Sequence, residues 1–137
     1  MELTHLHPLL VHFPIALIIV GFLFDVVSLF CKKEACLSKM GLYLMILGTL
    51  GTVAGYLTGE FFTPELTGEL GERKELHEVF AKTTMFVMIA ASVIRLAVLY
   101  YKKTESWYKW LVFGLFLIGT VSVGITGYLG GSIVYGE

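Results

Sequence analysis

HLHPLLVHFPIAL, residues 5–17, begins an apolar run that continues to about residue 30. A helix needs about 20 such residues to cross the roughly 30 Å of hydrocarbon in a bilayer. Three histidines, His5, His7 and His12, therefore stand at the entrance of a membrane-length segment. Imidazole at this depth is costly, so these histidines are expected to carry a function.

Three further apolar stretches follow the first. The four cover roughly residues 8–30, 40–59, 78–101 and 108–131, and 56% of the chain is hydrophobic against 15% charged. No charge-rich segment is left over for a soluble domain or for nucleic acid. We predict an all-α membrane protein: one transmembrane domain over residues 1–137, in which four helices form an up-down bundle.

The segments between the predicted helices differ in charge. CKKEACLSK and YKKTESWYK hold six of the ten basic residues, whereas the middle segment, GEFFTPELTGELGERKELHE, is mainly acidic. Because loops rich in Lys and Arg stay in the cytoplasm, both termini and the middle segment are expected on the periplasmic or outer side. All four histidines, including His77 at the start of the third apolar stretch, then share the outer face.

The histidines favour a haem. A haem b held without a covalent bond takes axial nitrogen ligands from two helices that stand apart. Counting back from the cytoplasmic ends matches His77 to His7 in height and places His12 about one and a half turns deeper. Helix tilt and a bend at Pro14 can absorb this difference in depth, so both His7 and His12 remain candidates to pair with His77. Lys82, one turn inside the third helix, is the expected cation for a propionate.

Glycines accumulate at the same face. The second and fourth stretches end near the histidines with Gly55, Gly59, Gly127 and Gly130. Small residues of this kind allow close packing of membrane helices. They also leave room for a flat macrocycle, so the sequence supports both interpretations.

Three other interpretations remain. His5, His7, His12 and His77 supply imidazoles that suit bare copper or zinc. A cofactor-free structural or assembly subunit would use the same histidines as hydrogen-bonding links between helices. Transport is disfavoured, because the two ionisable residues deep in the helices, Asp25 and Arg95, match in depth and are expected to form a structural ion pair.

The motifs HPLLVHFPIAL and GGSIVY resemble the two ends of a family of predicted bacterial membrane proteins of unknown function. The resemblance covers essentially the whole chain and implies four helices, a histidine opening the third, and the bacterial inner membrane as location. The positions that it singles out are His7, Pro8, His12, Pro14, His77, Gly130, Gly131 and Tyr135. Many relatives place a further histidine after the final VY, where this chain has Gly136, so a second pair would need His5.

The sequence thus predicts a small b-type cytochrome-like subunit that transfers electrons within the membrane. Its expected partners are membrane lipid, quinol, other membrane subunits or a periplasmic redox protein. No nucleophile triad, phosphate loop or pair of catalytic carboxylates is present, so the sequence indicates an electron-transfer subunit more than a stand-alone enzyme.

Overall fold

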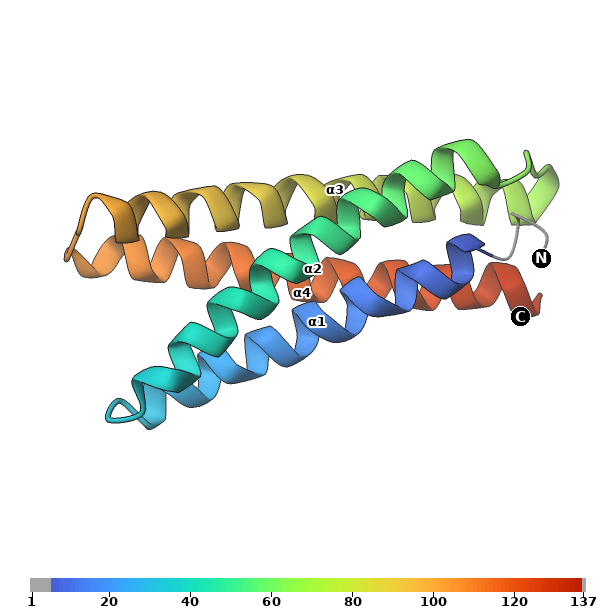
Figure 1. Ribbon diagram of the computed structural model, residues 1–137. Helices are drawn as coiled ribbons and strands as arrows, with labels where there is room; N and C mark the ends of the chain where they lie inside the picture. The colour runs from blue at the N-terminus through green and yellow to red at the C-terminus, as the bar shows by residue number, and fades with distance from the viewer. Residues whose placement is uncertain (1–5, 137) are drawn as a thin grey trace.

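The computed structural model describes residues 6–136. Within this range the chain forms helices and no strand, in the order α1 (Leu6–Phe30), α2 (Ala35–Phe62), α3 (Gly68–Tyr100) and α4 (Ser106–Tyr135). Successive helices run in opposite directions, so that the start of α1 and the end of α4 lie at the same end of the molecule (Figure 1). The predicted four-helix up-down bundle is confirmed.

Each helix extends beyond the apolar stretch that predicted it. The difference is largest for α3, which begins at Gly68 and therefore places His77 in its third turn. Ion pairs one turn apart, Arg73–Glu69 at 2.8 Å and Lys74–Glu78 at 3.6 Å, support this charged beginning. Hydropathy marks the part of a helix that suits hydrocarbon, whereas helical hydrogen bonding continues into the polar flanks.

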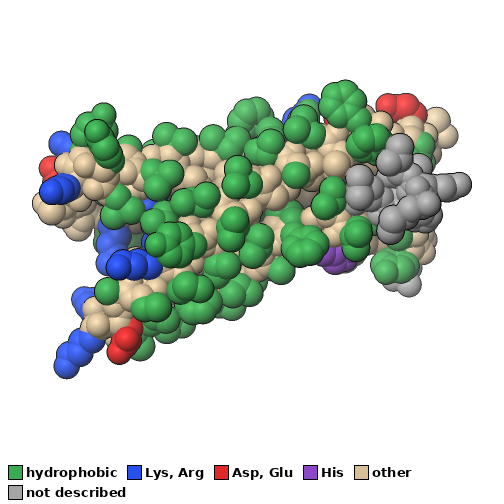
Figure 2. Space-filling model, viewed as in Figure 1, with side chains coloured by type: hydrophobic (Ala, Val, Ile, Leu, Met, Phe, Trp, Pro, Cys, Tyr) green, Lys and Arg blue, Asp and Glu red, His purple; other side chains and the backbone are tan. Residues whose placement is uncertain are grey.

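All four helices are long and apolar enough to cross a membrane. Large apolar side chains remain exposed along their length, and the space-filling view shows charged side chains gathered near the two ends (Figure 2). Such an apolar surface is the one that a lipid bilayer would cover. The chain is a multi-pass membrane protein.

The helices pack as two hairpins, α1 with α2 and α3 with α4. Glycines bring α1 and α2 close: a Cβ at Gly48 would lie 2.7 Å from Ile18 Cγ1, and one at Gly51 would lie 3.0 Å from Pro14 Cβ. This contact is the small-residue packing expected of membrane helices. It confirms close packing as one role of the glycines on α2.

The core between the hairpins combines apolar side chains with paired hydroxyls. Phe116, Ile18, Met45 and Met88 are fully buried at its centre. Beside them Thr49 Oγ1 lies 2.9 Å from the hydroxyl of Ser92, and Thr84 donates a hydrogen bond of 2.8 Å to Ser122. Each pair joins two helices, α2 with α3 and α3 with α4.

The two hairpins are not parallel to each other. Their connecting loops stand apart at one end, whereas α1 and α4 converge at the other (Figure 1). We call the end with the loops the basic end, because it carries Lys32, Lys33, Lys39, Lys102, Lys103 and Lys109. The opposite end, where His7 and His77 lie, is the histidine end.

Candidate functional site

His7 and His77 meet at the histidine end. The centres of their rings are 6.4 Å apart, and the ring planes are nearly perpendicular, at 87°. The two residues come from α1 and α3, which face each other across the bundle because α2 and α4 lie between them on either side. Of the two candidate ligands on α1, His7 and His12, the one that lies beside His77 is His7.

A hydrogen bond holds each ring at its Nδ1. His77 Nδ1 lies 3.0 Å from the carbonyl oxygen of Thr126, so this nitrogen carries the proton and donates it. His7 Nδ1 lies 3.0 Å from Thr58 Oγ1, whose own hydroxyl donates to backbone carbonyls of α2. His7 Nδ1 is thus also the donor. Both imidazoles keep the lone pair of Nε2 for a ligand.

Each ring also rests against a glycine of its own hairpin. A Cβ at Gly59 on α2 would lie 3.0 Å from His7 Cε1, and one at Gly130 on α4 would lie 3.3 Å from His77 Cε1. Gly55 and Gly127 lie deeper and face Val11 and Ile15 of α1. The glycines predicted to line the site therefore make room for the imidazoles and for close helix packing.

The remaining predicted ligands lie elsewhere. His12 is exposed, and its Nδ1 donates a 2.6 Å hydrogen bond to the carbonyl of Pro8 in its own helix. Five residues separate it from His7, which turns it by about 140° around α1. Lys82 is exposed and lies 5.8 Å from the ring centre of Tyr56. His5 lies outside the described residues.

A metal site of protein ligands alone is not formed in this arrangement. Among residues 6–136 no group of three or more His, Cys, Asp or Glu side chains is placed to hold a metal ion. Two imidazoles alone supply half of the four ligands that zinc usually takes.

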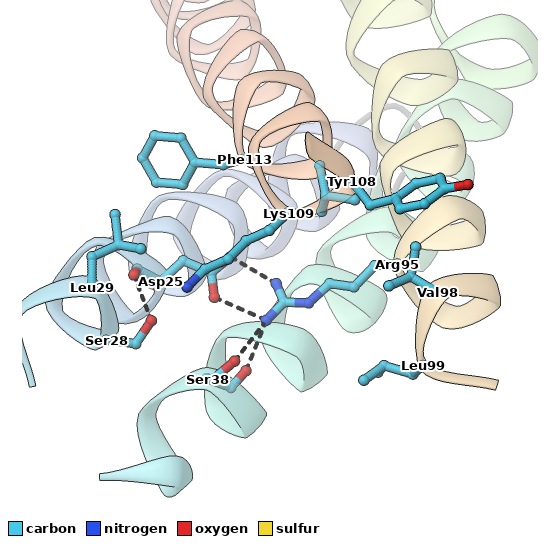
Figure 3. A pocket seen from close by; sticks show the side chains of 11 residues that line it. Asp25, Ser28, Leu29, Ser38, Arg95, Val98, Leu99, Tyr108, Lys109 and Phe113 are labelled. Carbon is cyan, nitrogen blue, oxygen red and sulfur yellow. Dashed lines mark hydrogen bonds and ion pairs between the residues drawn. The ribbon is translucent and has the colours of Figure 1, made fainter. Parts of the chain in front are cut away.

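Asp25 and Arg95 form the predicted ion pair near the basic end. Arg95 donates from its two terminal nitrogens to the two carboxylate oxygens, at 2.7 and 3.0 Å, and also reaches the backbone oxygen of Ser38 at 2.9 Å (Figure 3). The carboxylate and guanidinium side chains are only 10% and 13% exposed. This arrangement links α1, α2 and α3, and it is the structural pair that matched depth predicted.

The histidine pair and the ion pair have the same spacing in the sequence. Each joins residues of α1 and α3 that are 70 apart in the chain. Asp25 follows His7, and Arg95 follows His77, by about five full helical turns, or roughly 27 Å. Both pairs therefore lie on the same inner face of their helices. Sequence reasoning did not use this repeated spacing, and it also missed the supporting acceptors at Thr58 and Thr126.

The fold and the described helices define a four-helix, multi-pass membrane protein with a histidine pair at one end. The chain belongs to the family described as predicted membrane protein (DUF2231), whose family model matches residues 4–137. The resemblance seen in the terminal motifs is thereby confirmed. No curated protein and no solved structure matches the chain.

Proposed function

We propose that His7 and His77 are the axial ligands of a haem b and that the protein transfers electrons within its membrane. The observation that carries the proposal is the pair of facing imidazoles with both Nδ1 atoms engaged and both Nε2 atoms available. Ligating histidines are typically held in this way, with the second ring nitrogen donating to a carbonyl or another acceptor.

The distance between the rings suits two ligands of one ion. When two imidazoles bind opposite sides of an ion at about 2 Å, their ring centres are roughly 6 Å apart. The measured separation is 6.4 Å. A haem held by His7 and His77 would need space between α2 and α4, the helices that present Gly59 and Gly130. Because these glycines now contact the rings, haem binding requires α2 and α4 to separate at this end.

In this proposal the protein holds and orients the cofactor. When bound, the haem supplies a one-electron couple, and the chain supplies the ligands and a low-dielectric surrounding. Lys82 is the cation proposed for a propionate, and its side chain would turn away from the ring of Tyr56 to reach it. The electron donor would be quinol or another membrane subunit, and the electron acceptor a periplasmic redox protein. The histidine end would lie at the periplasmic face of the bacterial inner membrane.

The test is an absorption spectrum of the detergent-purified protein with one equivalent of haem, before and after reduction with dithionite. We expect the sharp α-band of a bis-histidine haem in the wild type and in His12→Ala. We expect its loss in His7→Ala and His77→Ala, with all three variants recovered from the membrane in similar amounts. A wild-type protein that does not take up haem would overturn the proposal, and retention of the band in His77→Ala would overturn the ligand assignment.

A cofactor-free structural subunit is the second candidate, favoured by the same two hydrogen bonds. His7 links α1 to α2 through Thr58, and His77 links α3 to α4 through Thr126. Hydrogen bonds of this kind contribute on average about 0.6 kcal/mol between membrane helices. This candidate predicts a colourless protein after incubation with haem and a small loss of stability in His77→Ala.

A further inference from the structure

A pocket of about 330 Å³ opens at the basic end, where the two hairpins stand apart (Figures 1 and 3). All four helices line it. Its volume falls within the range of ligand sites in proteins. It lies at the opposite end of the bundle from the proposed haem site, so the inference below does not depend on that proposal.

Most of the charge in this pocket is already neutralised. Asp25 accepts from two nitrogens of Arg95, and Arg95 also donates to Ser38. Lys109 reaches over the pocket with its amino group on the side of Asp25 (Figure 3). Within residues 6–136 its ammonium has no carboxylate within 4.0 Å. The pocket therefore presents one uncompensated positive charge.

The surroundings strengthen this positive potential. Basic side chains gather where the loops of the two hairpins stand apart, and the space-filling view shows them bordering the notch between the hairpin ends (Figure 2). The segments CKKEACLSK and YKKTESWYK hold these six lysines but only two acidic residues, Glu34 and Glu105. An anion is thus attracted toward this end.

Apolar side chains complete the lining of the pocket. Leu29 of α1 and Phe113 of α4 lie on one side of Lys109, and Val98 of α3 lies on the other side (Figure 3). Trp107 and Trp110, both exposed at the start of α4, mark the boundary between hydrocarbon and headgroups. A ligand in this pocket therefore meets both a cation and hydrocarbon side chains, a combination that suits an anionic amphiphile.

We propose that this pocket binds an anionic phospholipid from the leaflet at the basic end. Its phosphate lies against Lys109, and part of an acyl chain lies along Leu29 and Phe113. Basic pockets between membrane helices bind anionic headgroups in this way. Free phosphate would pair with the Lys109 ammonium equally well but would leave the apolar side chains of the lining without a partner. The complete lining therefore favours the lipid.

The two tryptophans of the chain provide the test, since both lie at this end and Trp110 packs against Phe113 with ring centres 5.7 Å apart. The protein is reconstituted in phosphatidylcholine vesicles that contain equal mole fractions of brominated phosphatidylglycerol or brominated phosphatidylcholine. The preference is the ratio of tryptophan quenching by the two lipids. We expect the wild type to prefer phosphatidylglycerol.

Matched variants locate the site. Lys109→Gln should lower the preference about fivefold, the effect of one lysine near an anionic headgroup, and Lys109→Arg should keep it. Lys103→Gln, at the same end but outside the pocket lining, should change it less. Equal loss in both glutamine variants, or no preference in the wild type, would overturn a defined site. Reversal of the quenching by inorganic phosphate would identify a phosphate site and overturn the lipid.

Discussion

Breaking the Asp25–Arg95 pair should destabilise the bundle far more than an exposed ion pair would. Asp25→Asn keeps the shape of the side chain but leaves the guanidinium without its counter-charge, and Arg95→Met leaves the carboxylate alone. The two side chains are 10% and 13% exposed, so water replaces little of the lost interaction. Removal of one partner of a buried pair costs about 3–5 kcal/mol. This is a large part of the about 5–15 kcal/mol that stabilises a typical protein.

The double variant separates the interaction from the cost of each substitution. Because it leaves no unpaired charge, we expect it to lose about 2–3 kcal/mol less than the sum of the two single variants. Equilibrium unfolding by SDS in mixed micelles, followed by helical circular dichroism, measures these differences. As a control, Glu69→Gln removes an exposed partner of Arg73 on α3 and should cost about 0.5 kcal/mol or less. Additive losses would refute the reasoning, because they would mean that the two charges do not interact.

Three further predictions concern other parts of the bundle. Gly130→Ala should be less stable than Gly131→Ala by about 1 kcal/mol in the same assay, because His77 Cε1 lies 3.3 Å from the added Cβ and must shift, whereas a Cβ at Gly131 meets nothing within 4 Å. Cys31 and Cys36 are exposed at the basic end, so a membrane-impermeant maleimide should label them only after the cells are opened; labelling of intact cells would reverse the predicted orientation. Thr84→Val removes a buried hydrogen bond between α3 and α4 and should cost about 0.6 kcal/mol, and a loss above 2 kcal/mol would contradict this role.

The sequence predicted those features that depend on position along a helix axis. Hydropathy located the four helices, and equal distance from the basic end paired Asp25 with Arg95. Each of these follows from the rise per residue, which is nearly constant along an α-helix.

Features that depend on rotation and packing were not available from the sequence. Height along the membrane matched His7 to His77 but did not exclude His12, whereas the rotation between them turns only His7 toward His77. The hydrogen bond from His77 to the carbonyl of Thr126 depends on how α3 sits against α4. The separation of the hairpins at the basic end likewise depends on how side chains of four helices interdigitate. The repeated spacing of 70 residues in the two pairs would have strengthened the choice of His7 from the sequence.

His7 and Asp25 lie on the same face of α1, and each contacts α3, one near each end of the helix. A turn of α1 about its own axis would move His7 and Asp25 through the same angle, because about five whole turns separate them. The ion pair therefore sets the rotational position from which the histidine presents its ring. A substitution that let α1 rotate at the ion pair would therefore be expected to turn His7 away from His77 as well.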